Sequence, residues 1–106
     1  MAAEKRQIHL SGPDINQADI DAVLTVLQSR HLALGPKLQE FEEAMAAHAG
    51  RKHGVAVNSG TSALHLLMLA LGVGPGDEVL TTPFSFIASS NCILMVGARP
   101  VFLDIE

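Results

Sequence analysis

Two short segments of the chain carry residue types that could bind a phosphorylated ligand. The first, Asn58-Ser-Gly-Thr-Ser62, connects an expected strand to an expected helix. Its small residues let the backbone approach a ligand closely, and the N–H groups of a first helical turn have no partner within the helix. The helix dipole adds about half a positive charge there, and the hydroxyls of Thr61 and Ser62 can donate hydrogen bonds. The segment therefore predicts a phosphate site; the alternative is that Ser59 or Thr61 only caps the helix.

The second segment, Thr82-Pro-Phe-Ser-Phe86, follows the next expected strand. It contains Phe84 and Phe86, half of the four aromatic residues in the chain. An aromatic ring at this place could stack on a flat cofactor ring, whereas the alternative is that both rings fill a core beneath a helix. Neither segment has the glycine spacing of a dinucleotide-binding or Walker motif, which disfavours a nucleotide-binding domain of the Rossmann type.

Alternating strands and helices are expected to position these two segments. Short apolar runs predict strands at residues 55–57, 78–82 and 100–103, and longer ones predict helices at residues 61–71 and 85–96, the latter followed by Gly97. Such alternation with short connections predicts a parallel α/β layer. Ligands bind outside the carboxyl ends of strands in such sheets, which is where both segments fall. The helix at 61–71 is apolar nearly all round and is therefore expected to be buried.

The preceding part of the chain predicts two helices after a loose tail at residues 1–7 and an extended piece at residues 8–10. The first helix is expected to begin at the N-cap Asn16 and carries an apolar stripe of Ile20, Val23, Leu24 and Leu27. The second is expected to begin at Pro36 and end at Gly50, with an apolar face of Leu38, Phe41, Met45 and His48. We therefore divide the chain into residues 1–52, a tail with two helices, and residues 53–106, a strand–helix–strand–helix–strand unit.

Composition narrows the class of protein. The 106 residues are 48% hydrophobic and 17% charged, with a net charge of −4, and no basic cluster suggests nucleic acid or a membrane surface. The one cysteine, Cys92, cannot form an internal disulfide and is expected to be a small buried hydrophobe. A polar N-terminus, no long apolar segment and no metal-like histidine spacing predict a soluble cytoplasmic protein without a metal site.

Several ordered motifs together resemble one family. They are Leu32-Ala-Leu-Gly-Pro-Lys37 followed by Phe41-Glu42, Asn58-Ser-Gly-Thr-Ser-Ala-Leu-His-Leu66, Gly74-Pro-Gly-Asp-Glu-Val79, Thr82-Pro-Phe-Ser-Phe-Ile-Ala88 and Pro100-Val-Phe-Leu-Asp104. From about Ile8 to the last residue the chain is similar to the DegT/DnrJ/EryC1/StrS aminotransferases, in their N-terminal part. The resemblance implies an incomplete large domain of fold type I, the fold of pyridoxal-phosphate-dependent transferases, with parallel strands covered by helices.

The resemblance also implies a function and site residues. Family members transfer an amino group, usually from glutamate, to a keto group of a nucleotide-linked sugar for polysaccharide biosynthesis; a few act on other cyclic ketones or dehydrate. Gly60, Thr61 and Ser62 would hold the phosphate of pyridoxal 5′-phosphate, and Phe86 would stack on its ring. The protein would be a homodimer, with glutamate and a nucleotide sugar as its substrates.

The resemblance places the lysine that binds the cofactor beyond Glu106, so no catalytic residue is expected within the chain. Lys5, Lys37 and Lys52 do not occupy its position, which predicts that the 106 residues alone are inactive. The alternative function is a non-catalytic α/β module that binds pyridoxal phosphate or another phosphorylated ligand. The strand at residues 55–57 would lack the neighbours that it has in the family, so we also expect poor stability or a different arrangement.

Overall fold

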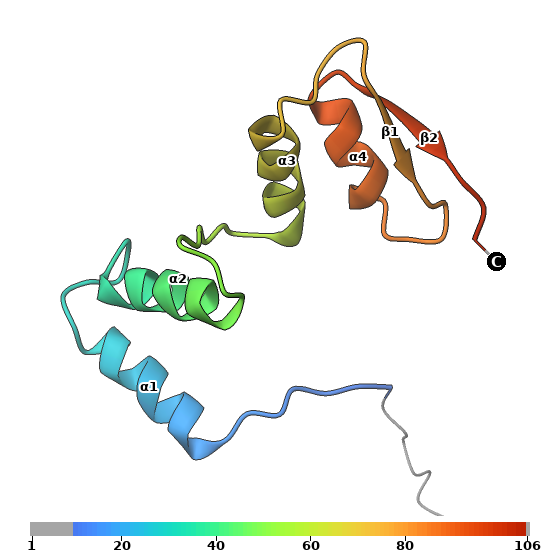
Figure 1. The fold of residues 1–106 in the computed structure, drawn as a ribbon. Helices are drawn as coiled ribbons and strands as arrows, with labels where there is room; N and C mark the ends of the chain where they lie inside the picture. The colour runs from blue at the N-terminus through green and yellow to red at the C-terminus, as the bar shows by residue number, and fades with distance from the viewer. Residues whose placement is uncertain (1–9, 106) are drawn as a thin grey trace, which may run out of the picture. The chain divides into compact units, whose positions relative to one another are not determined.

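The computed structural model describes residues 10–105, which form four helices and two strands (Figure 1). The chain clusters into two compact units, Met1–Phe41 and Glu42–Glu106, which we describe separately. The division expected from sequence character, between residues 52 and 53, stays a prediction. Most of the extended piece expected at residues 8–10 lies outside the described residues.

Helix α1, Gln17–Leu27, begins where the sequence predicted. The side chain of Asn16 accepts hydrogen bonds from the backbone N–H groups of Ala18 and Asp19, at 2.8 and 3.4 Å. In return, Asp19 Oδ2 accepts from the N–H of Asn16 at 2.9 Å. This reciprocal capping box satisfies two backbone donors of the first turn and confirms Asn16 as the N-cap. The predicted apolar stripe of α1 remains on the surface, with its four side chains 45–60% exposed.

Helix α2, Pro36–His48, also begins as predicted, and Gly50 follows its end at a φ of 62°. A hydrogen bond from the N–H of Arg51 to the carbonyl of Ala46, at 2.8 Å, closes this end. The apolar face noted in the sequence lies at the surface of the described residues, since Leu38, Phe41 and Met45 are 36–55% exposed. The face that packs instead contains Ala46, which is 7% exposed, because the chain returns against that side of the helix after it ends.

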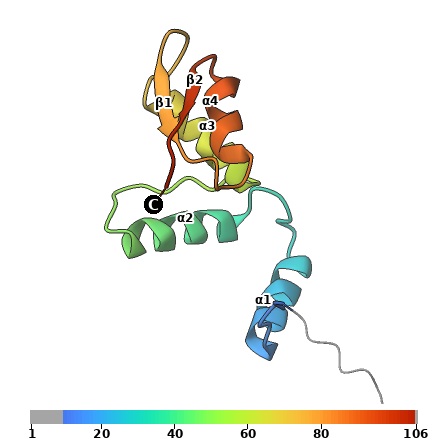
Figure 2. The ribbon, with the colours of Figure 1, turned by 90° about the vertical axis from the view of Figure 1, so that its right-hand side faces the viewer.

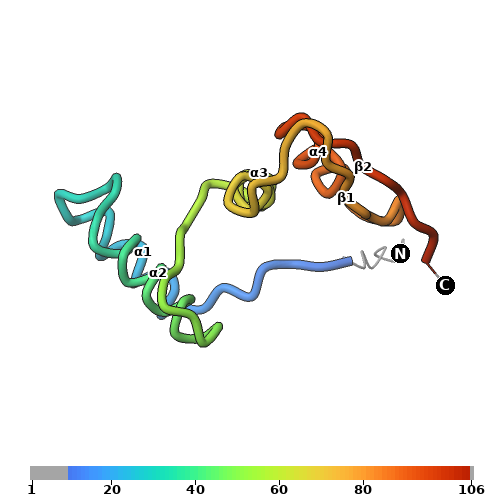
Figure 3. Tube along the Cα trace, turned by 45° about the horizontal axis from the view of Figure 1, so that its top comes forward, coloured from blue at the N-terminus to red at the C-terminus, as the bar shows by residue number. Residues whose placement is uncertain are grey.

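The second unit is built on two parallel strands. Strand β1, Glu78–Thr81, pairs in parallel with β2, Arg99–Phe102, in the register Glu78↔Arg99 to Thr81↔Phe102. Helix α4, Ala88–Met95, connects the strands and covers one face of them, and α3, Gly60–Ala70, packs on α4 (Figures 1 and 2). The path from α3 through β1 and α4 to β2 can be followed in Figure 3. This strand–helix–strand order is the parallel α/β arrangement that the sequence predicted.

A small core joins these elements. Cys92 and Ile93 of α4 and Ala98 before β2 are 1–5% exposed, and partly buried side chains from α3, β1 and the turns pack around them, namely Leu64, Met68, Val73, Val79 and Val96. The burial of Cys92 confirms its expected place among the apolar residues. Beyond α4, Gly97 has a φ of 79°, which only glycine adopts freely, and this turns the chain back into β2.

Two sequence-based expectations for this unit were wrong. Residues 55–57 do not form a strand, because β1 and β2 pair with each other and the described residues offer 55–57 no ladder partner. Helix α3 has no fully buried residue, and Leu66, Leu67 and Leu69 are 46–55% exposed. Within the described residues, α4 is the only element that contacts α3 extensively. Although α3 is apolar nearly all round, it is therefore covered along one side only.

The small core predicts low stability and a strong dependence on Ile93. We expect the 106-residue chain to unfold over a broad temperature range, with a midpoint below the ~45–65 °C typical of mesophile domains.

Ile93→Ala is expected to remove the unfolding transition, since such truncations cost about 2–5 kcal/mol in a packed core. Leu94→Ala is the matched control, because this neighbouring side chain is 57% exposed, and it should change little. Far-ultraviolet circular dichroism on heating measures all three; a sharp transition of the unsubstituted chain at high temperature would contradict the prediction.

Candidate functional site

The Asn58–Ser62 loop forms the start of α3. Ser59 is the N-cap, and its hydroxyl oxygen accepts a hydrogen bond from the backbone N–H of Ser62 at 3.1 Å. The hydroxyl of Ser62 donates to Asn58 Oδ1 at 2.8 Å and lies 2.9 Å from the hydroxyl of Ser59. Since a serine has one hydroxyl proton, Ser59 must be the donor in that last contact. The loop is thus closed by its own side chains.

This network separates the roles that the sequence left open for the loop. Ser59 caps the helix, and the Ser62 hydroxyl is engaged within the loop, whereas Thr61 has no side-chain hydrogen bond to any described residue. The N–H groups of Gly60 and Thr61 belong to the first helical turn, which has no preceding turn to accept from them. Capping and phosphate binding are therefore compatible, because different residues of the loop serve each.

A pocket of about 460 Å³ opens beside this loop. Its lining comes from the first turns of α3 and from the start of α4, namely Gly60, Thr61, Ala63, Leu64, Phe86, Ala88 and Ser89. The volume lies within the roughly 300–1,000 Å³ usual for small-molecule sites. A side chain added at Gly60 would meet no atom within 4 Å, so glycine leaves this wall open to a ligand.

The pocket brings together three of the four residues that the sequence selected. Gly60, Thr61 and Phe86 line it, and Ser62 does not. The ring of Phe86 is 76% exposed, which excludes the core-filling alternative for this residue in the present structure. Phe84 is 84% exposed and lies outside the lining.

Sequence reasoning did not select Ser89. This residue lines the pocket from the first turn of α4, and its hydroxyl lies 2.8 Å from that of Ser85. The available signal was its position, because it lies in the first turn of the helix that follows the Thr82–Phe86 segment. A hydroxyl there was as accessible to sequence reasoning as those of Thr61 and Ser62.

The electrostatic character of the pocket comes from backbone dipoles. None of its lining side chains carries a formal charge. Both α3 and α4 present their N-terminal turns to it, and each helix N-terminus carries about half a positive charge. The first-turn N–H groups of Gly60 and Thr61, the Thr61 hydroxyl and two positive helix ends are suited to an anionic group such as a phosphate monoester.

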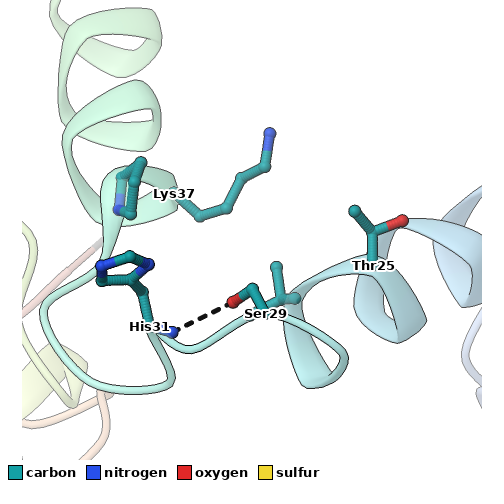
Figure 4. A pocket seen from close by; sticks show the side chains of 6 residues that line it. Thr25, Ser29, His31 and Lys37 are labelled. Atoms are coloured by element: carbon teal, nitrogen blue, oxygen red, sulfur yellow. Dashed lines mark hydrogen bonds between the residues drawn. The ribbon is translucent and has the colours of Figure 1, made fainter.

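A second pocket, of about 130 Å³, lies in the first unit (Figure 4). Thr25, Ser29, His31 and Lys37 are among its lining residues. Lys37 is paired with Glu40, the Thr25 hydroxyl donates to the carbonyl of Asp21, and Ser29 accepts from the N–H of His31. The side chains of Thr25, Ser29 and Lys37 thus already have protein partners, whereas the hydroxyl of Thr61 has none among the described residues.

No group of three or more His, Cys, Asp or Glu side chains among residues 10–105 is placed to hold a metal ion. No helix in the same range is long and apolar enough to cross a membrane.

Comparison with known proteins gives concordant matches. Residues 13–106 match the DegT/DnrJ/EryC1/StrS aminotransferase family. The chain is 43% identical over 97 residues to a UDP-4-amino-4-deoxy-L-arabinose–oxoglutarate aminotransferase of Shewanella sediminis, covering 92% of this chain and 25% of that protein. It is 50% identical over 94 residues to the spore coat polysaccharide biosynthesis protein SpsC of Bacillus subtilis, covering 89% and 24%. The chain thus spans about a quarter of the length of these relatives.

Solved structures agree with this assignment. The sugar aminotransferase Spr1654 of Streptococcus pneumoniae, in its PLP form, superposes with a TM-score of 0.88 at 40% identity, over 95% of this chain and 26% of that one. PseC of Helicobacter pylori, an aminotransferase of pseudoaminic acid biosynthesis, gives 0.88 at 39% identity, over 95% and 28%. The fold is therefore part of a type I aminotransferase fold, and the family and the PLP and PMP forms of its neighbours indicate pyridoxal phosphate as the cofactor. The chain belongs to the DegT/DnrJ/EryC1/StrS aminotransferase family.

Proposed function

We propose that this chain is the N-terminal part of a pyridoxal-phosphate-dependent sugar aminotransferase and supplies the phosphate end of the cofactor site. The observation that supports it is the pocket at the start of α3 and α4, where two helix N-termini lie beside the Thr61 hydroxyl, which has no partner among residues 10–105. The aminotransferase relatives in this family support the reaction class. When bound, pyridoxal phosphate supplies the electron sink for amino-group transfer.

In this proposal the residues of the chain bind and orient the cofactor. The N–H groups of Gly60 and Thr61 and the Thr61 hydroxyl hold the phosphate, while Ser62 keeps the loop closed through Asn58. The ring of Phe86, on the α4 side of the same pocket, faces the flat ring of the cofactor. The transferred amino group comes from glutamate and goes to a keto group of a nucleotide-linked sugar, in keeping with the sugar-directed activities of the relatives.

Neither of the described lysines takes a catalytic role in this function. Lys37 pairs with Glu40, and neither Lys37 nor Lys52 lines the pocket. Transamination needs a lysine that holds the cofactor and moves a proton, so we propose that the 106 residues alone are inactive. A homodimer and a cytoplasmic location belong to the same proposal.

Thr61→Ala tests the phosphate site. Pyridoxamine 5′-phosphate is the probe, because it has no aldehyde and cannot react with surface lysines, and pyridoxamine shows what the phosphate contributes. Hydrogen bonds to charged groups contribute about 1.5–3 kcal/mol, so Thr61→Ala should weaken binding of the phosphorylated probe about tenfold or more. Isothermal titration calorimetry measures the affinities.

The control for Thr61 is Thr25→Ala, which removes a threonine hydroxyl that donates to the carbonyl of Asp21 outside this pocket. It should bind the probe as the unsubstituted chain does. Equal affinity of the unsubstituted chain for pyridoxamine and its phosphate would contradict the proposed phosphate site.

Borohydride reduction tests the absence of a catalytic lysine. We expect the chain, treated with pyridoxal phosphate and then borohydride, to show only partial adducts spread over several lysines. The reason is that neither Lys37 nor Lys52 lines the pocket. Peptide mass spectrometry locates the adducts; one stoichiometric adduct on a single lysine that disappears with excess pyridoxamine 5′-phosphate would contradict this prediction.

A further inference from the structure

Residues 54–57 precede the proposed phosphate loop, Asn58–Ser62. They are held by the side chain of Glu42 from α2, where a neighbouring strand would hold them in a sheet. Oε1 of Glu42 accepts a hydrogen bond from the backbone N–H of Ala56 at 2.8 Å, across 14 residues of sequence. The contact is partly buried. A hydrogen bond to a carboxylate is stronger than one between neutral groups, so Glu42 satisfies a donor that a sheet would otherwise pair.

The backbone itself rests on the same turn of α2. A Cβ added at Gly54 would lie 2.5 Å from the carbonyl oxygen of Glu42 and 3.5 Å from the nitrogen of Ala46. No side chain larger than hydrogen fits there without movement, because real Cβ contacts are longer than this. Gly54 and Ala56 are partly buried while Val55 is 79% exposed, so the two small residues are the ones that approach α2.

This contact continues directly into the phosphate loop. Ala56 precedes Asn58 by two residues, and Asn58 Oδ1 accepts the hydroxyl proton of Ser62 in the first turn of α3. The position of the loop therefore depends on two hydrogen bonds, one from the Ala56 N–H to the Glu42 carboxylate and one from the Ser62 hydroxyl to Asn58 Oδ1. Glu42 is not among the residues that line the pocket, and a carboxylate beside a phosphate would repel it, so its influence must pass through the backbone.

We propose that Glu42 is a positioning residue for the cofactor phosphate: its carboxylate holds the backbone at Ala56 so that Asn58–Ser62 presents its donors to the ligand. This inference rests on the proposed function, because it assumes that the loop binds the phosphate. It assigns a role to the Phe41-Glu42 motif, which lies outside the pocket. Gly54 is the second part of the same device, since it admits the segment to the surface of α2.

Nuclear magnetic resonance of the 106-residue chain tests the proposal with two readouts. Hydrogen exchange of the Ala56 amide reports the contact, and titration with pyridoxamine 5′-phosphate, followed at the Gly60 and Thr61 amides, reports the site. Glu42→Ala should speed exchange at Ala56 and weaken binding about tenfold, the lower end for a lost hydrogen bond to a charged group. Binding of pyridoxamine, which has no phosphate, should not change.

Two variants separate positioning from a general loss of structure. Glu42→Gln keeps an oxygen that can accept from Ala56 and should recover most of the affinity that Glu42→Ala loses. Glu40→Ala is the matched control, because this glutamate lies in the same helix and pairs with Lys37 at the surface; it should leave both readouts unchanged. If Glu42→Ala does not fold, Gly54→Ala replaces it, since the added methyl group displaces the segment with Glu42 intact, and the same loss of binding is expected.

The outcomes for the two proposals are distinct. Faster exchange at Ala56 with unchanged binding of the phosphorylated probe would overturn the role of Glu42 while the phosphate site stands. Failure of Glu42→Gln to recover binding, in a chain with intact helical signals, would also overturn it. If the unsubstituted chain does not distinguish pyridoxamine 5′-phosphate from pyridoxamine, the phosphate site and the role of Glu42 both fall.

Discussion

Helices α3 and α4 pack against each other around Cys92 and Ile93, and this contact brings their N-terminal turns to the two sides of one pocket. The parallel pairing of β1 with β2 supports it, because α4 connects these strands and is held against them. A change in the α3–α4 contact would move Thr61 relative to Phe86. The site is thus made by packing between helices, although hydrogen bonds within the loop complete its shape.

The small core has a second consequence: backbone N–H groups must find hydrogen-bond acceptors on nearby side chains. Side chains serve this purpose at several points: Asn16 caps α1, Ser59 caps α3, and Asp77 Oδ2 accepts from the N–H of Gly74 in the turn before β1. Glu42 does the same for Ala56. Polar side chains placed at chain turns therefore preserve local geometry where a sheet of two strands supplies few hydrogen bonds.

Local structure was largely predictable from sequence, and packing was not. The N-cap at Asn16, the helix start at Pro36 and the glycine turn at Gly97 depend on the chemistry of single residues, which the sequence displays directly. A strand depends on a partner, so the apolar run at residues 55–57 did not suffice to form one. The same limit applies to α3, whose leucines predict burial but do not supply the surface that would cover them.

The same distinction applies to the candidate site: the residue types were predictable from sequence, and their contacts were not. Loop chemistry pointed to the segments Asn58–Ser62 and Thr82–Phe86, and within them the family resemblance selected Gly60, Thr61 and Phe86, which meet in the pocket. Only the structure distinguished the hydroxyl of Ser62, which is engaged by Asn58, from that of Thr61, and only the structure connected Glu42 to the loop. Those distinctions depend on which atoms meet in space, and residue type alone does not determine them.

A crystal structure of the chain with pyridoxamine 5′-phosphate would show directly whether the start of α3 binds the cofactor phosphate. We expect to find the phosphate at the N–H groups of Gly60 and Thr61, within hydrogen-bond distance of the Thr61 hydroxyl, and the ring of the ligand against Phe86. A phosphate bound elsewhere, such as beside His31 and Lys37, with the pocket at the start of α3 empty, would contradict this expectation.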